Sequence, residues 1–248
     1  MTDYLFEKAY RVNSYETDAS GKLCVPGLFN YLQDIASDHA TILKLGREHL
    51  LKDKLFWVLS RIMLEMNSFP EWGEEIIIRT QPNGTDKLFA LRDFEIIGHK
   101  GIRHGGASSC WLMVNQEKRR PVRPDKLLEK FVNDKEEGIF HGRYPGKIDA
   151  LDGSSYKSNT FPVKYSDLDI NMHVNNVQYI KWVLDTYPLD FIYQNSLKTA
   201  EINYISESLP GDDIYILVQE SDEGLFKHSI IRNNDKKELC RLILGWKQ

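Results

Sequence analysis

Residues 165–185 read YSDLDINMHVNNVQYIKWVLD, and residues 15–36, which read YETDASGKLCVPGLFNYLQDIA, follow a similar outline. In both stretches a Tyr followed by acidic residues leads to a Val and then to an amphipathic run. Each run is followed by strand-like segments that share a turn, FPEWGEEIII at 69–78 and LPGDDIYIL at 209–217. A Cys-containing apolar stretch lies near the end of each half. Four correspondences in the same order indicate a duplicated unit.

Each half is predicted to contain one long helix. The first helix places Pro26 in its opening turn. Its apolar residues recur at helical spacing: Leu28, Leu32, Ile35, Ala36 and Leu43. The second helix can be capped by Asn175 or Asn176 and is ended by Pro188. Its apolar residues with the same spacing are Val177, Ile180, Leu184 and Tyr187.

Runs rich in Val, Ile, Tyr, Phe and Trp surround each helix and are separated by turn residues, which is typical of strands. In the first half these runs cover 4–14, 55–68, 74–82, 86–98 and 103–117, and in the second half 155–165, 197–206, 212–221, 224–233 and 237–246. Both halves therefore follow the order β-α-ββββ. This order predicts an α+β fold in which an antiparallel sheet wraps around a long helix, twice in one chain.

The predicted organisation is an N-terminal unit over residues 1–120, a linker over 121–153 and a C-terminal unit over 154–248. The linker is charged, contains prolines and is predicted to hold one short helix near 124–132. A basic cluster lies where the linker begins. It is explained either as a solvated face or as a docking patch for an acidic partner. Its members are Lys118, Arg119, Arg120, Arg123 and Lys126.

Composition narrows the class of protein. The chain has 248 residues, 42% of them hydrophobic, and a net charge of −4, which argues against nucleic acid as the main partner. No run reaches the ~18 consecutive apolar residues that a membrane-spanning helix needs. The opening residues MTDYLFEKAY lack the pattern of a signal peptide. Three scattered cysteines fit a reducing compartment, so we expect a cytoplasmic protein.

Three polar residues alternate with apolar ones directly before the second predicted helix: Asp169, Asn171 and His173. In an extended strand they would share one face, beside the free N–H donors of a helix start, which stabilise a developing negative charge. The alternative is that Asp169 and Asn171 form turn and capping hydrogen bonds. The equivalent segment of the first half, residues 18–25, lacks the alternation and the His. This difference favours a function for the polar row, with one active centre per chain.

Glu207 is the candidate general base, because it ends the strand candidate EINYISE just before a turn. A carboxylate next to a buried pocket would have a raised pKa, which is useful for taking a proton from water. The alternative is a solvated surface residue. Cys24, Cys110 and Cys240 lie in or beside apolar runs and are predicted to pack in the core. The sequence shows no zinc-ligand spacing, phosphate-binding loop or nucleophile elbow, so no cofactor or metal is predicted.

The whole chain resembles the acyl-(acyl carrier protein) thioesterases. The most specific stretch is DLDINMHVNNVQYIKWVLD at 167–185. Further matching stretches are FWVLSRIMLEM at 56–66, FPEWGEE at 69–75, LRDFEI at 91–96 and SSCWLMVNQEKRRP at 108–121. The resemblance implies a tandem (double) hot-dog fold, which is two long helices, each wrapped by an antiparallel sheet. It also implies hydrolysis of the thioester that joins a fatty acyl chain to the carrier protein, in fatty acid biosynthesis.

The same resemblance implies that Asp169, Asn171, His173 and Glu207 are the catalytic residues. Many plant members have a Cys directly after the Glu, where this chain has Ser208. A Ser without an evident base is a poor nucleophile, so we expect water to attack the thioester directly. Which of Glu207, Asp169 and His173 is the general base stays open, because interacting groups titrate together.

Acyl carrier protein is acidic as a class, so the resemblance also implies docking at the basic cluster. The acyl chain is expected in the N-terminal unit, along the face of Leu28, Leu32 and Ile35, which core packing explains equally well. Two other functions stay open: a coenzyme A thioesterase of the same fold and a non-catalytic acyl-binding module. The chain has no plastid-targeting extension, which favours a bacterial cytoplasm. The fold is compatible with a homodimer.

Overall fold

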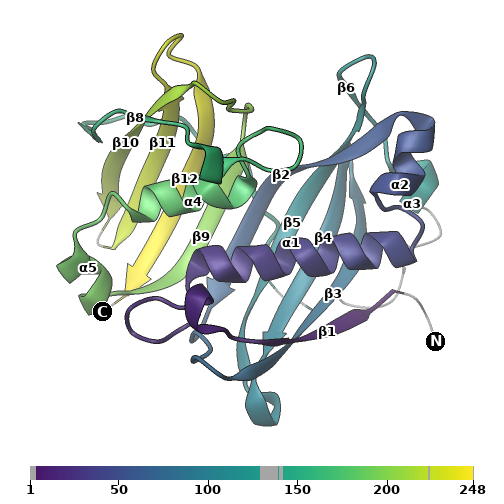
Figure 1. Ribbon diagram of the computed structural model, residues 1–248, viewed down its shortest axis with the longest axis horizontal. Coiled ribbons are helices and arrows are strands. Elements are labelled where there is room, and N and C mark those ends of the chain that lie inside the picture. Colours follow the sequence, from purple (N-terminus) through teal and green to yellow (C-terminus); the bar gives the residue numbers. More distant parts are fainter. Residues whose placement is uncertain (1–3, 129–138, 140–141, 223, 248) are drawn as a thin grey trace. The chain divides into compact units, whose positions relative to one another are not determined.

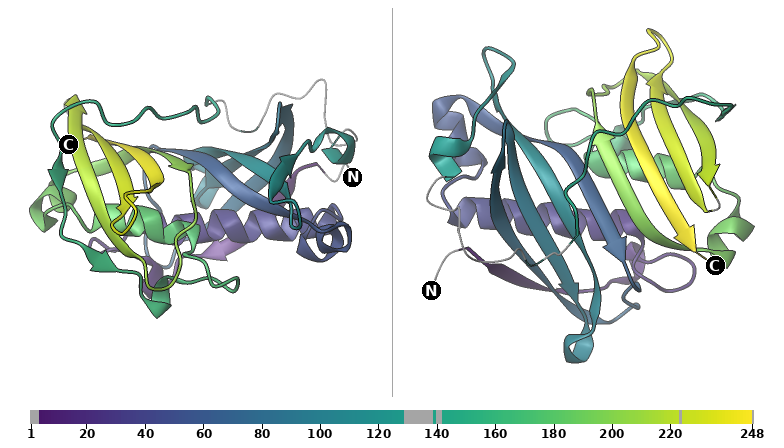
Figure 2. Two further views of the ribbon diagram at one scale, coloured as in Figure 1. Left: turned by 90° about the horizontal axis from the view of Figure 1, so that it is seen from above. Right: turned by 180° about the vertical axis from the view of Figure 1, so that it is seen from behind.

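The computed structural model describes residues 4–128, 139, 142–222 and 224–247. The chain forms two compact units, residues 1–145 and 146–248 (Figure 1). The division falls inside the segment that the sequence assigns to a linker. Each unit is built from a helix and an antiparallel sheet, and the view from behind shows the strands of each unit lying over its helix (Figure 2).

Unit 1 contains one long helix, α1 (Val25–Ile42), and a sheet whose strands follow the order β1-β3-β4-β5-β2. The bounds of these strands are β1 Phe6–Arg11, β2 Leu55–Met66, β3 Glu75–Asp86, β4 Phe89–Ile97 and β5 Arg103–Asn115. Short elements complete the unit: η1 (Ser14–Glu16), α2 (Arg47–Leu50), η2 (Leu51–Asp53), η3 (His99–Gly101), β6 (Arg120–Val122) and α3 (Asp125–Leu128). All the strand pairs are antiparallel, as the order of elements predicts.

The core of unit 1 lies between α1 and the sheet. Pro26 lies in the first turn of α1, and the Cys24 sulfur accepts a hydrogen bond from the Gly27 N–H (3.4 Å). The apolar face of the helix is buried completely, with Leu28, Leu32 and Ile35 at most 1% exposed. Apolar residues of β3 and β4 are equally buried: Ile76, Ile78, Phe94 and Ile96. The helix face on which the acyl chain is expected is therefore buried inside the unit, and the acyl-chain site stays a prediction.

Unit 2 contains α4 (Asn176–Leu184) and a sheet whose strands follow the order β9-β12-β11-β10-β7. The bounds of its strands are β7 Tyr156–Lys157, β8 Phe161–Pro162, β9 Ser196–Tyr204, β10 Asp213–Asp222, β11 Leu225–Arg232 and β12 Glu238–Lys247. Two short helical segments, η5 (Tyr165–Asp167) and α5 (Leu189–Gln194), flank α4. Asn175 caps α4, since its side-chain oxygen accepts from the Val177 N–H at 3.0 Å.

Two sequence predictions differ from the structure. The strand predicted over 155–165 is interrupted between β7 and β8, because the Ser158 hydroxyl accepts from the Ile216 N–H (2.9 Å) where a continuous strand would offer a carbonyl. The predicted linker begins with a strand, since β6 pairs with β5. The short helix predicted near 124–132 corresponds to α3, and residues 129–132 lie outside the described residues. In the part of the chain that the structure describes, every helix is too short or too polar to cross a membrane.

His228 is a buried titratable group in the core of unit 2. His228 lies on β11 and is 1% exposed, and its Nε2 lies 3.0 Å from the Tyr187 hydroxyl. Burial lowers the pKa of His228 to about 3, because a charged imidazole would lose its hydration there. In the unfolded chain the same imidazole takes up a proton near its ordinary pKa of 6.5.

The free energy of unfolding should therefore decrease as the pH falls from 6.5 toward 3, since only the unfolded chain binds this proton. At pH 5 the loss from this residue is about 2 kcal/mol. Urea unfolding at pH 7 and pH 5 checks it. In His228→Gln the free energy of unfolding should fall by about 2 kcal/mol less between pH 7 and pH 5 than in the parent. In the control His99→Gln, at an exposed position, it should fall as in the parent. An unchanged pH dependence in His228→Gln would contradict the expectation.

Candidate functional site

The segment before α4 forms a tight turn. Leu168 and Val174 pair as an isolated bridge, and the Asp169 N–H donates to the His173 carbonyl at 2.7 Å. Met172 takes a left-handed backbone with φ of 62°, which is uncommon for a residue with a side chain. The prediction that Asp169, Asn171 and His173 share one face of an extended strand is therefore wrong.

The carboxylate of Asp169 closes this turn. Its Oδ1 accepts from the N–H groups of Asn171 (2.8 Å) and His173 (3.1 Å), and its Oδ2 lies 3.3 Å from the Asn171 side-chain amide. Local bonds of this kind compete with strand pairing, which is why the segment bends. Asp169 thus makes turn hydrogen bonds, which is the alternative interpretation of this residue in the sequence.

The structure brings Glu207 next to His173. The Nδ1 of His173 lies 3.7 Å from the Oε1 of Glu207, and the two side chains are 38% and 54% exposed. The Val174 N–H donates to the Ser208 carbonyl at 3.1 Å, and this bond joins the turn to the segment that carries Glu207. Asn171 is exposed on the same turn. Two of the four predicted site residues thus form a pair that solvent reaches, with Asp169 and Asn171 in the adjoining turn.

A bulge lies at the end of β9, just before Glu207. The N–H groups of Ile205 and Ser206 both donate to the carbonyl of Leu239, at 2.9 and 3.1 Å. One carbonyl thus serves two successive donors, which interrupts the regular ladder. The hydroxyl of Tyr204 donates to the Asn176 carbonyl (3.1 Å) and ties β9 to the first residue of α4. Glu207 therefore projects from a braced segment beside the helix start.

Three supporting residues could not be assigned a role from the sequence. Asp212 accepts from the Ser208 hydroxyl (3.0 Å) and the Leu209 N–H (2.9 Å), and it pairs with Arg232 at 3.3 Å. Tyr179 on α4 is 3% exposed, and burial raises the pKa of its phenol although a hydrogen bond with the Ser208 backbone opposes this. The LPGDD turn is the sequence signal for Asp212, while Arg232 and Tyr179 have none.

Some of the backbone N–H groups at the start of α4 already have hydrogen-bond acceptors within the protein. The N–H of Val177 donates to the Asn175 side chain at 3.0 Å, and the N–H of Gln178 donates to the Asn175 carbonyl at 2.9 Å. The side-chain amide of Asn171, on the turn that adjoins the acid–imidazole pair, is a further donor and lies 3.3 Å from the Asp169 Oδ2. Together these groups can move a proton and stabilise a negatively charged oxygen, which is the chemistry of acyl transfer.

The comparisons with known proteins identify one family across both units. Residues 3–131 match the model of the acyl-ACP thioesterase N-terminal domain, and residues 152–248 match that of the acyl-ACP thioesterase C-terminal domain. The chain therefore belongs to the acyl-ACP thioesterase family, as the sequence resemblance predicted.

Two plant relatives illustrate the similarity. A chloroplastic acyl-[acyl-carrier-protein] hydrolase of Cuphea viscosissima is 29% identical over 92% of this chain and 59% of its own length. A chloroplastic palmitoyl-acyl carrier protein thioesterase of Arabidopsis thaliana is 28% identical over 82% of this chain and 52% of its own length. The chain thus spans between half and two thirds of the length of these curated relatives.

Two solved structures share the fold over almost the whole chain. The crystal structure of an acyl-ACP thioesterase from Bacteroides thetaiotaomicron is 27% identical, covers 100% of both chains and superposes with a TM-score of 0.89. The 12:0-ACP thioesterase from Umbellularia californica is 20% identical, covers 98% of this chain and 97% of its own, and gives a TM-score of 0.84. These matches confirm the predicted tandem hot-dog fold.

Proposed function

We propose that this protein hydrolyses the thioester of fatty acyl-(acyl carrier protein) and releases a free fatty acid. The observation that supports it best is the contact of 3.7 Å between His173 and Glu207, beside the start of α4. An acid–imidazole pair at a helix start suits a reaction in which a proton leaves water and a carbonyl oxygen becomes negative. Membership of the acyl-ACP thioesterase family supports the choice of substrate.

In the proposed reaction, water attacks the thioester carbonyl carbon, and the His173–Glu207 pair takes up its proton. The carbonyl oxygen becomes negative and is stabilised by the Asn171 amide and the remaining N–H groups of the first turn of α4. The carbon–sulfur bond then breaks, and the sulfur leaves as the carrier thiol with a proton returned by the imidazole. The products are a fatty acid and the free carrier. A cytoplasmic and bacterial setting stays a prediction from the sequence.

Glu207→Gln and His173→Ala should each reduce kcat with acyl-carrier substrate by ~10²-fold or more, because each removes a proton-transfer group. Steady-state release of free thiol measures this. Glu220→Gln, at an exposed position of β10, is the matched control and should retain the parent kcat. Hydrolysis at the parent rate in both site variants would remove the proposed mechanism.

We propose that Ser208 is a structural residue and not a nucleophile. It is 0% exposed, and its hydroxyl donates to the Asp212 carboxylate at 3.0 Å, so the oxygen is buried and already hydrogen-bonded. A nucleophilic serine needs a base in contact and a hydroxyl that the substrate can reach. Asp212 is in contact with the Ser208 hydroxyl, but that hydroxyl is buried. Water is therefore the proposed nucleophile.

Ser208→Ala should lower Tm by about 2–4 °C, since it leaves Asp212 with one buried partner fewer. The same variant should keep kcat within about threefold of the parent, because the hydroxyl takes no part in the reaction. Thermal unfolding and thiol release on one preparation test both statements. Loss of hydrolysis with an unchanged Tm would instead support a serine nucleophile.

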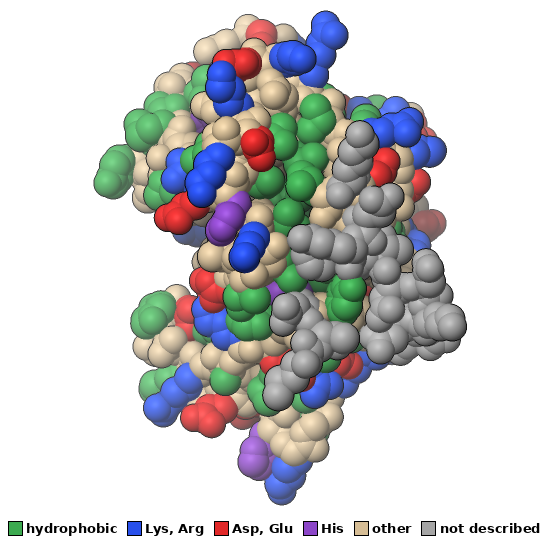
Figure 3. Space-filling model, turned by 90° about the vertical axis from the view of Figure 1, so that its right-hand side faces the viewer, with side chains coloured by type: hydrophobic (Ala, Val, Ile, Leu, Met, Phe, Trp, Pro, Cys, Tyr) green, Lys and Arg blue, Asp and Glu red, His purple; other side chains and the backbone are tan. Residues whose placement is uncertain are grey.

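We propose that the carrier protein docks at the basic hairpin formed by β5, β6 and the turn between them. The side chains of Lys118, Arg119, Arg120 and Arg123 are exposed there, and that of Lys126 lies outside the described side chains. Figure 3 faces unit 1 from the side of α2 and α3 and shows Lys and Arg side chains exposed over this side. A cluster of exposed cations attracts an acidic partner and mainly raises the rate of encounter.

Replacing Arg119 and Arg120 together by Glu should lower kcat/KM for acyl-carrier substrate by about 10-fold, because each reversal turns attraction into repulsion. With the same acyl group on coenzyme A, kcat/KM should change little. The matched control reverses Lys236 and Lys237, two exposed cations in another hairpin. An equal loss with both substrates would argue against docking at this hairpin. Faster turnover of the coenzyme A substrate by the parent would favour the coenzyme A thioesterase.

A further inference from the structure

The turn that carries the proposed site occurs twice in the chain. In unit 1 the N–H of Asp18 donates to the Lys22 carbonyl at 2.8 Å, and in unit 2 the N–H of Asp169 donates to the His173 carbonyl at 2.7 Å. The left-handed position is Gly21 (φ 77°) in the first turn and Met172 (φ 62°) in the second. The two backbones are thus closed by the same bonds.

The aspartate makes the same side-chain bonds in both turns. Asp18 Oδ1 accepts from the N–H groups of Ser20 (2.8 Å) and Lys22 (3.3 Å). Asp169 Oδ1 accepts from those of Asn171 (2.8 Å) and His173 (3.1 Å). In each turn the aspartate Oδ1 accepts hydrogen bonds from the backbone N–H groups two and four residues after the aspartate. The pattern is a property of the turn, because it forms in unit 1 without the site residues.

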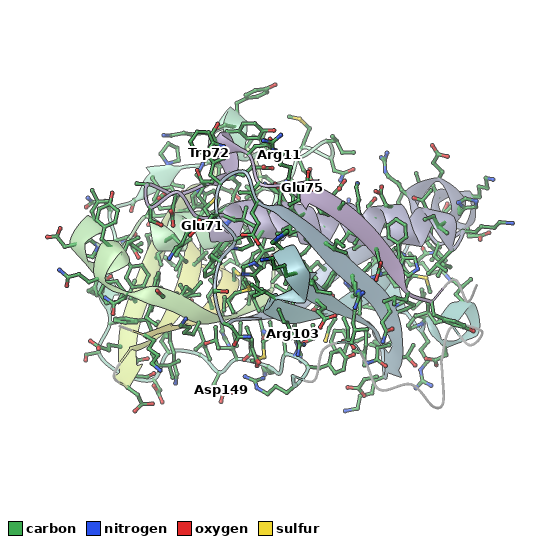
Figure 4. All side chains as sticks on the ribbon, turned by 90° about the horizontal axis from the view of Figure 1, so that it is seen from below. Arg11, Glu71, Trp72, Glu75, Arg103 and Asp149 are labelled. Atoms are coloured by element: carbon green, nitrogen blue, oxygen red, sulfur yellow. The ribbon has the colours of Figure 1, made fainter. Side chains whose placement is uncertain are left out.

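The turns also contact equivalent segments. The N–H of Leu23 donates to the Pro70 carbonyl (2.8 Å), as that of Val174 does to the Ser208 carbonyl (3.1 Å). The segment after Pro70 bears Glu71 and Trp72, which Figure 4 labels. Phe69 precedes Pro70 where Glu207 precedes Ser208. Unit 1 therefore matches unit 2 in the turn but has Lys22 in place of His173 and Phe69 in place of Glu207.

We infer that Asp169 is a positioning residue, and that its carboxylate holds the turn while His173 and Glu207 carry out the proton transfer. This inference rests on the proposed function and assigns roles within the same site. Asp169 Oδ1 is engaged by two backbone donors, and its bond to the His173 N–H places the imidazole next to Glu207. The two units share the turn that the aspartate closes. They differ in the residues on and beside it, because only unit 2 has His173 and Glu207 at these positions.

Four variants test the assignment: Asp169→Asn, Asp169→Ala, Asp18→Asn and Asp18→Ala. An asparagine oxygen still accepts both backbone bonds, so Asp169→Asn should keep kcat/KM within about 10-fold of the parent, with unmoved midpoints in its pH profile. Asp169→Ala should lose about 10²-fold or more. Asp18→Ala should keep the parent kcat/KM. Both alanine variants should lower Tm by about 2–4 °C, and both asparagine variants should restore it.

Two results would overturn the inference. One is an Asp169→Asn variant as inactive as Asp169→Ala that also loses a limb of the pH profile, which would make Asp169 the proton acceptor. The other is a Tm that falls in Asp18→Ala but not in Asp169→Ala, which would show that the turns differ. If the parent hydrolyses no thioester, the proposed function fails. Amide hydrogen exchange at Asn171 and His173 then still decides the turn's role, because it should accelerate in Asp169→Ala and not in Asp169→Asn.

Discussion

Each unit of this protein depends on one carboxylate that closes the turn ahead of its helix. The turn exposes backbone N–H groups that neither the helix nor the sheet can pair, and a side-chain oxygen must accept them. Asp18 and Asp169 supply that oxygen, with distances of 2.8 to 3.3 Å to their backbone donors. Because His173 is one of those donors, the position of the imidazole follows from the turn and not from the sheet.

The hydrophobic core supplies the frame that this turn needs. Ile180 and Val183 on α4 and Ile214 and Ile216 on β10 are 0% exposed, so the helix start cannot move freely relative to the sheet. Capping by Asn175 and the bond from Tyr204 to Asn176 add polar anchors at the same end. Unit 1 has an equivalent frame but presents Lys22 at the position of the imidazole. Of the two turns, the one in unit 2 thus places an imidazole beside a carboxylate, which is the asymmetry that the sequence indicates; the pair of His104 with Glu74 at 2.9 Å lies elsewhere in unit 1.

Periodicity predicted the long elements well, because burying an apolar face leaves a clear pattern. Most strands differ from the predicted ranges by a few residues at their ends, as with β2 (Leu55–Met66), and α1 (Val25–Ile42) contains the predicted periodic positions from Leu28 to Ala36. Prediction failed where a side chain replaced a backbone partner. Ser158 interrupts a strand in this way, and Asp169 bends a segment whose alternation is typical of a strand. A methionine at 172 gives no sign of a left-handed backbone either.

The sequence by itself determined the two repeated units, their order of elements and the residue types able to perform acyl transfer, because these follow from local pattern and composition. Only the tertiary structure decided that Glu207 meets His173 at 3.7 Å, that Ser208 is buried against Asp212, and that Asp169 serves the backbone. The physical reason is that Glu207 lies more than thirty residues from the turn in the chain. The β9 bulge and the bond between Val174 and Ser208 bring these segments together, and neither can be read from the residues that they join.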